Sequence, residues 1–229
     1  MSYSYSKDDE RAEAAIDAFK DELLERYRGK LLLSVNESEL KSGMESFADP
    51  EGNLYVLERC YKEFPCTLNI TLRERRDTFV REAENGNYEI YDENGVFLRN
   101  ADENGINNKL DGAPNIILNG ADTRARVLEI AEVCKIFARE FSALRSVVDS
   151  VELSKAVSQY DYDRISFRLR CGLSVELRNY LNLTEQKLNA AATVFGGLNG
   201  EQKLRGEIYV LVASDGTVRA EYSPYPISV

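Results

Sequence analysis

The sequence predicts an α+β fold in two parts, a smaller N-terminal unit and a larger unit built on a mostly antiparallel β-sheet with flanking helices. Two observations support this prediction. Apolar residues recur at helical spacing near the N-terminus, and further along they alternate with polar residues between turn signals such as Asn94-Gly95. Of the 229 residues, 43% are hydrophobic, which is enough to form a core. We place the units at 1–77 and 78–224, followed by a tail at 225–229.

The N-terminal unit is predicted to contain two helices and a hairpin. Apolar residues within 8–28 fall every three or four positions, which is typical of an amphipathic helix. A second helix is expected to begin at Asn36, which has the spacing of a capping box with Glu39. Strands are expected over 53–61 and 67–75, because the second of these alternates strictly between apolar and polar residues.

The larger unit combines short strands with two longer helices. Asn182 and Glu185 have the spacing of a capping box and are expected to open the second of these helices. The expected helices are 123–144 and 183–195, and the expected strands lie around 88–90 and 96–98 and over 147–153, 164–170, 173–178, 207–213 and 217–222.

Composition excludes several classes of function. The chain has 29 Lys plus Arg and 39 Asp plus Glu, so its net charge is 29 − 39 = −10, which makes nucleic acid a poor partner. It contains no histidine, which removes Ser-His-Asp and Cys-His catalytic arrangements and histidine-ligated metal sites. No glycine motif has the spacing that binds phosphate. The sequence therefore predicts no catalytic, metal or cofactor residues, although a carboxylate-dependent glycan hydrolase remains an alternative.

Cysteines and a repeated acidic motif have structural interpretations. Cys134 falls on the apolar side of the long helix and is expected in the core. Cys60 and Cys66 flank a turn, so they either form a disulfide or stay as two reduced thiols. Asp-Glu-Asn-Gly occurs at 92–95 and 102–105, but without the spacing of a calcium loop, so we interpret both copies as turns.

The last hairpin is the most conspicuous candidate for a binding surface. Residues 208–213 are strongly β-forming and apolar on both faces, and they precede a turn at 214–216 and an alternating strand. A final strand can either complete the core or leave a sheet edge open to a partner strand.

Several segments, in order, resemble the FtsQ/DivIB family of bacterial cell division proteins. The stretch from Lys30 to Arg75 resembles that family's POTRA domain, with Phe64-Pro65-Cys66-Thr67-Leu68-Asn69-Ile70 matching its Pro-x-Thr-Leu-x-Ile strand. The further matching segments are 91–96, 113–116, 119–120, 172–177 and Lys187-Leu188. This resemblance implies a POTRA-like domain followed by a β domain.

The resemblance also implies a function and a location. Family members are non-catalytic scaffolds anchored in the cell membrane by one span, which would precede residue 1 of this chain, with this region extracytoplasmic at the division septum. Their last strands bind FtsB/DivIC-like and FtsL-like partners. By position, the binding residues in this chain would be Val212, Ala213, Ser214, Asp215, Gly216, Val218, Ala220 and Tyr222. A further alternative with the same fold is a POTRA chaperone module of outer-membrane assembly.

Overall fold

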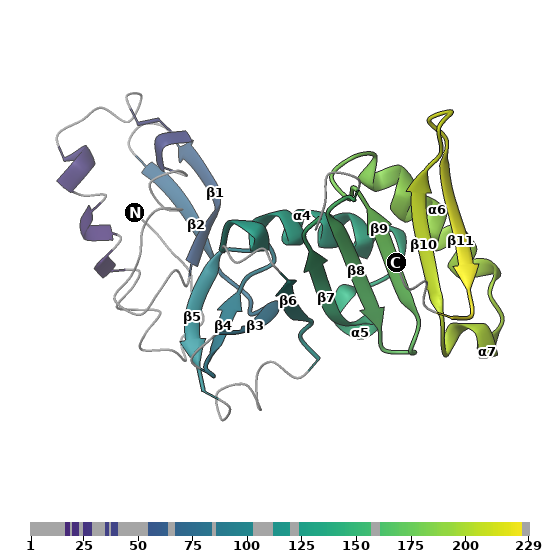
Figure 1. Cartoon of the computed structure of the whole chain (residues 1–229). Coiled ribbons are helices and arrows are strands. Elements are labelled where there is room, and N and C mark those ends of the chain that lie inside the picture. The colour runs from purple at the N-terminus through teal and green to yellow at the C-terminus, as the bar shows by residue number, and fades with distance from the viewer. Residues whose placement is uncertain are drawn as a thin grey trace. The chain divides into compact units, whose positions relative to one another are not determined.

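The chain divides into two compact units, Met1–Arg76 and Asp77–Val229. Figure 1 shows the computed structural model from which they are described. It describes residues 17–18, 20–22, 25–28, 35–36, 38–40, 55–63, 67–83, 86–102, 112–119, 124–156 and 161–225. The combination of helices with a large sheet confirms the predicted α+β class.

The first unit has helical segments and one hairpin in its described part. Residues 17–18, 20–22 and 25–27 are helical, and a second helix includes residues 38–40. The Oδ1 atom of Asn36 accepts hydrogen bonds from the N–H groups of Ser38 at 3.0 Å and Glu39 at 3.4 Å, which confirms the predicted N-cap. The remaining parts of both predicted helices lie outside the described residues.

Two antiparallel strands complete the described part of this unit. Strand β1 is Tyr55–Glu63 and β2 is Thr67–Glu74, in the register that places Glu63 opposite Thr67. Both predicted strands are therefore confirmed. The turn between them, which includes Cys66, lies outside the described residues, as does the side chain of Cys60, so the disulfide alternative stays a prediction.

The second unit is built on a mixed sheet of nine strands in the order β11-β10-β9-β8-β7-β6-β3-β4-β5. The strands are β3 (Phe79–Glu82), β4 (Tyr88–Tyr91), β5 (Phe97–Ala101), β6 (Asn115–Asn119), β7 (Val148–Ser154), β8 (Arg164–Leu169), β9 (Ser174–Arg178), β10 (Glu207–Val212) and β11 (Val218–Ser223). Five of its pairings are antiparallel, and three, β3 with β6, β6 with β7 and β9 with β10, are parallel. The helical connections β6 to β7 and β9 to β10 allow two of the parallel pairs.

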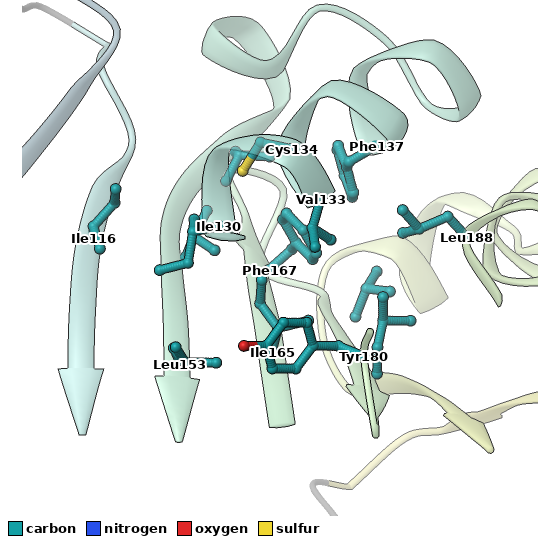
Figure 2. Packing of buried hydrophobic residues seen from close by; sticks show 14 of the residues in the cluster. Ile116, Ile130, Val133, Cys134, Phe137, Leu153, Ile165, Phe167, Tyr180 and Leu188 are labelled. Carbon is teal, nitrogen blue, oxygen red and sulfur yellow. The ribbon is translucent and has the colours of Figure 1, made fainter. Parts of the chain in front are cut away.

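Helices α4 (Arg124–Glu140) and α6 (Thr184–Gly197) pack against each other and against one face of this sheet. Figure 2 shows the resulting core, in which Phe137 stacks on Phe167 with ring centroids 4.4 Å apart. Cys134 is buried there, as predicted, and burial raises the pKa of its thiol. Within the described residues, we find no helix that is long and apolar enough to cross a membrane.

The long helix is shorter than predicted. Helix α4 ends at Glu140, and a separate short helix, α5 (Leu144–Val147), leads into β7. The break covers residues 141–143, and Ala143 has a backbone conformation (φ −52°, ψ 119°) that is not helical. The helical turn of α5 also includes Val147, so β7 begins one residue later than the predicted strand.

The predicted capping box of α6 is wrong. The residue before the helix is Leu183, with a left-handed φ of 53°, and no side chain caps the helix. Instead, the Thr184 hydroxyl donates to the carbonyl oxygen of Tyr180 at 2.6 Å. The buried ring of Tyr180 fixes the chain just before the helix, which leaves Asn182 outside it in a turn.

The turn interpretation of the first acidic motif is confirmed. Oδ1 of Asp92 accepts hydrogen bonds from the N–H groups of Asn94 and Val96, both at 2.8 Å. Gly95 has a φ of 76°, and a Cβ there would lie 2.7 Å from the carbonyl oxygen of Val127 in α4. Most of the second copy, at 102–105, lies outside the described residues.

Candidate functional site

Strand β11 lies at one end of the sheet. It pairs with β10 without a register shift, from Ser223 opposite Glu207 to Val218 opposite Val212. On its other side, the described part of the chain supplies no strand. The C-terminal hairpin therefore both completes the core and leaves an open sheet edge. Strand β10 contributes Ile208 and Val210 to the core, and β11 is the edge.

The hydrogen bond nearest the turn fixes which backbone groups face outward. The N–H of Ala213 donates to the carbonyl oxygen of Thr217 at 2.8 Å, so Thr217 faces β10. In an antiparallel strand, the N–H and C=O groups of successive residues point alternately to one neighbouring strand and to the other side. The backbone groups of Arg219, Glu221 and Ser223 therefore also point to β10. The N–H and C=O groups of the remaining strand residues point to the open side, and these residues are Val218, Ala220 and Tyr222.

The two faces of β11 differ in chemistry. The side chains of Val218, Ala220 and Tyr222 are partly buried against the core on the face that α6 covers. On the opposite face, Arg219 and Glu221 are exposed. The edge is thus amphipathic, with apolar groups on one side of the strand and one charge of each sign on the other.

Polar contacts hold this edge in place. The Tyr222 hydroxyl donates to the carbonyl oxygen of Arg205 at 3.2 Å. The Tyr209 hydroxyl donates to Oε2 of Glu221 at 2.5 Å, and this bond raises the pKa of Tyr209 by favouring its protonated form. Both contacts cross from β11 to segments on its inner side, so they leave its open side free.

The tip of the hairpin is the other part of the predicted surface. Residues 214–217 are exposed, and Gly216 has a φ of 83°. The carboxylate of Asp215 accepts hydrogen bonds from the hydroxyl and the N–H of Thr217, and both lower the pKa of Asp215. All eight predicted binding residues therefore lie on one hairpin. Only three of them, however, direct backbone groups to the open edge.

The opposite edge of the sheet, β5, is less suited to accept a strand. Its pairing with β4 contains a register shift between Ile90 and Tyr91. Arg99 in β5 forms a two-bond ion pair with Asp77, at 2.8 and 2.5 Å. A surface pocket of about 490 Å³ beside this strand is lined by Asn87, Arg99, Asn100, Ala101 and Asp102. Bulges and charged side chains of this kind discourage strand pairing, which leaves β11 as the better candidate.

Sequence reasoning missed a pocket at the Tyr222 end of β11. It has a volume of about 380 Å³ and is lined by Asn199, Glu201, Gln202, Arg205, Tyr222 and Pro224. The guanidinium of Arg205 makes no ion pair with any described residue. No local pattern could have found this pocket, because its two halves meet only when β11 folds back on β10.

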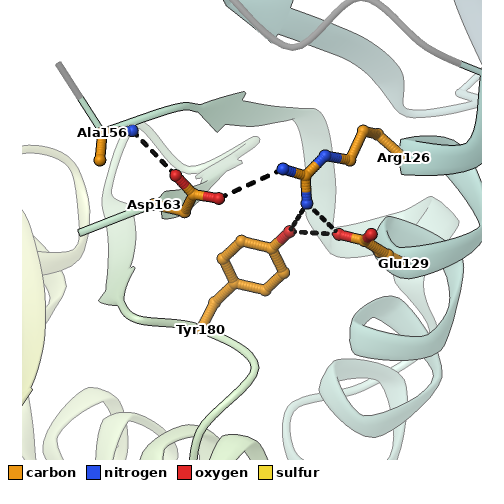
Figure 3. A network of polar contacts seen from close by, with 5 residues as sticks. All are labelled: Arg126, Glu129, Ala156, Asp163 and Tyr180. Carbon is orange, nitrogen blue, oxygen red and sulfur yellow. Dashed lines mark hydrogen bonds and ion pairs between the residues drawn. The ribbon is translucent and has the colours of Figure 1, made fainter.

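A partly buried polar network joins α4 to the segments that flank β7, β8 and β9, as Figure 3 shows. Arg126 donates to Oε2 of Glu129 at 2.6 Å and to Oδ2 of Asp163 at 3.3 Å, and Tyr180 donates to the same Glu129 oxygen at 2.7 Å. Burial, followed by the bond to Glu129, raises the pKa of Tyr180. Oδ1 of Asp163 accepts from the N–H of Ala156.

This network is a structural clamp. Both of its carboxylates bind the same guanidinium, so neither is placed to act as a free acid or nucleophile. Across the described residues, no group of three or more His, Cys, Asp or Glu side chains could hold a metal ion.

Similarity to known proteins is found among solved structures. No family model and no curated protein matches the chain. The chain is similar in structure to the major extracytoplasmic domain of the trans isomer of the bacterial cell division protein DivIB from Geobacillus stearothermophilus. The sequence identity is 17% and the TM-score is 0.33, over 56% of this chain and 99% of that one.

Proposed function

We propose that this chain is the extracytoplasmic part of a membrane-anchored, non-catalytic scaffold of bacterial cell division. In this proposal, the first unit is a POTRA-like domain, and the second binds an extended segment of a partner at the division septum. The partners are FtsB/DivIC-like and FtsL-like division proteins, as the sequence resemblance implies. The binding residues are those of the hairpin tip and of β11.

The observation that carries the binding proposal is the open side of β11. Val218, Ala220 and Tyr222 each direct one N–H and one C=O away from β10, so three donors and three acceptors are available in a row. An added strand would satisfy these groups by main-chain hydrogen bonds. It would also extend the sheet next to α6, where every second side chain of the added strand would meet an apolar surface.

The experiment measures binding of the purified chain to the extracytoplasmic regions of an FtsB/DivIC-like and an FtsL-like protein from the same genome. We expect the wild-type chain to bind. We expect Ala220→Pro to weaken binding about tenfold or more, because proline lacks the outward N–H and its ring obstructs the incoming strand. An edge strand tolerates proline at such a position, so the fold should persist.

Ala220→Ser is the matched control, because it keeps both the small side chain and the N–H. It should bind like the wild type. Circular dichroism and thermal unfolding establish that both variants fold. If Ala220→Pro binds as tightly as Ala220→Ser, the edge is not the site. If the wild type binds neither division protein, the assignment of partners is wrong.

A further inference from the structure

The sequence of β11 is complementary to itself. Its residues Val218, Arg219, Ala220, Glu221 and Tyr222 place one charge of each sign symmetrically about a central alanine. We propose that two copies of this chain associate through β11, antiparallel to each other, with Ala220 of one copy opposite Ala220 of the other. The two sheets then form one continuous sheet about a two-fold axis.

Backbone geometry favours this register. An antiparallel pair alternates between positions that exchange two hydrogen bonds and positions that exchange none. With Ala220 opposite Ala220, Val218 of each copy lies opposite Tyr222 of the other. These are the three residues whose N–H and C=O groups point to the open side, so all three outward-facing positions form hydrogen-bonded pairs.

Charge complementarity selects the same register. Arg219 of each copy lies directly opposite Glu221 of the other, so the dimer adds two ion pairs to the contacts of the monomer. Within one copy, Arg219 lies 3.8 Å from the carboxylate of Asp215, and Glu221 accepts a hydrogen bond from the Tyr209 hydroxyl. Both side chains are exposed on the face away from α6, where they can reach a neighbour. A shift of the register by two residues would place Arg219 opposite another Arg219, or Glu221 opposite another Glu221, which is unfavourable.

The ends of the paired strands are also compatible. In this register, Thr217 of each copy lies opposite Ser223 of the other, which brings the exposed tip of one hairpin to the level of Pro224 in the second copy. Pro224 lines the pocket that contains Arg205. The carboxylate of Asp215 at the tip, which lies 3.8 Å from Arg219 of its own copy, is thereby brought toward the pocket of the second copy.

Self-association has a regulatory consequence. It uses the same backbone groups as the strand addition proposed above, so each copy can bind either a second copy or another protein, but not both. The pairing itself does not depend on the identity of that other protein. It can therefore be tested with the purified chain alone, and its failure would leave the proposed function intact.

The test is sedimentation equilibrium of the chain up to about 1 mM, since a short strand pair gives a weak dimer. We expect the wild type to dimerise. We expect Arg219→Glu and Glu221→Arg, each alone, to weaken dimerisation about tenfold or more. Each substitution turns both ion pairs of the symmetric dimer into pairs of like charges. The double variant, Arg219→Glu with Glu221→Arg, restores both ion pairs and should dimerise like the wild type.

A mixture of the two single variants gives a further readout. One variant then has two acidic side chains on β11 and the other has two arginines, so the mixed dimer contains two ion pairs and should form in preference to either self-pair. Arg168→Glu, an exposed charge reversal on the interior strand β8, should leave dimerisation unchanged. A chain that stays monomeric up to about 1 mM overturns the proposal. Failure of the double variant to dimerise also overturns it.

Discussion

The side chain of Lys187 is fully buried, and its Nζ atom donates to the carbonyl oxygen of Arg178 at 2.6 Å. It also donates to the carbonyl oxygen of Asn179 at 2.7 Å. These two bonds join helix α6 to the end of β9. Asn179 itself has a left-handed φ of 46°. Burial lowers the pKa of Lys187 to about 8, because the charged form is poorly solvated there.

This burial predicts a pH-dependent stability. In the unfolded chain, Lys187 has its ordinary pKa of 10.5, so between about pH 8 and 10.5 the unfolded state binds more protons than the folded state. The free energy of unfolding therefore rises with pH across this interval, by about 3 kcal/mol from this one group. Below about pH 8, both states are protonated and the contribution is constant.

Urea unfolding at a series of pH values checks this prediction. The difference in unfolding free energy between the wild type and Lys187→Met should grow in favour of the wild type as pH rises through the interval. Lys155→Met, which removes an exposed lysine, is the control substitution. Parallel curves for the wild type and Lys187→Met would contradict the prediction.

The clamp of Figure 3 gives a second prediction. Tyr180→Phe removes the hydroxyl that donates to Glu129 at 2.7 Å but leaves the ring in the core. The hydroxyl also accepts a longer hydrogen bond from Arg126, at 3.4 Å, and Arg126 keeps its bond to Glu129. The cost should therefore be about 1 kcal/mol, the usual contribution of one good hydrogen bond. Tyr162 is 56% exposed, and Tyr162→Phe should leave the unfolding midpoint unchanged. Equal effects of the two substitutions would refute a specific role for the Tyr180 hydroxyl.

The stacked aromatic rings of the core give a third prediction. Phe137 is fully buried and stacks on both Phe141 and Phe167. Phe137→Ala should lower the free energy of unfolding by about 3–5 kcal/mol, through lost burial and the cavity that remains. On the same helix, Leu128 is 47% exposed, so Leu128→Ala should change it by less than about 0.5 kcal/mol. Chemical denaturation of both variants provides the comparison.

Elements of this fold could be predicted from the sequence where the determining signal is local. The period-two pattern of β2 and the buried positions of α4 follow from alternation and helical spacing alone. Asn36 could be identified as an N-cap because its contacts lie within three residues. The turn at Asp92 is local for the same reason.

Features that depend on distant residues could not be predicted. The spacing of Asn182 and Glu185 suggests a capping box, but the buried ring of Tyr180, held by Glu129 on another helix, determines where α6 begins. The strand order, with β3 between β4 and β6, also has no local signal. The outward direction of Ala220 depends on the bond that closes the hairpin turn, so the sequence could identify the strand but not its exposed backbone groups.

The fourth prediction concerns Gly206, where β10 begins beside the end of β11. It has a φ of 92°, and a Cβ there would lie 2.3 Å from the carbonyl oxygen of Ser223 and 3.0 Å from the ring of Tyr222. Gly206→Ala should therefore cost more than the roughly 1–2 kcal/mol of left-handed strain, because Ser223 must also move. Displacing Ser223 disturbs the strand that carries the open edge, so dimerisation and partner binding should weaken as well.

Gly216→Ala separates the two causes of the expected destabilisation, which are the left-handed backbone strain and the collision with Ser223. Gly216 has a similar φ of 83°, but a Cβ there meets nothing within 4 Å, so this variant carries the backbone strain without the collision. Thermal unfolding should rank the wild type as most stable, Gly216→Ala next and Gly206→Ala last, and dimerisation should follow the same order. If the two variants are equally stable, the close approach of Ser223 to Gly206 does not constrain this edge, and β11 is held in place by its contacts with α6 instead.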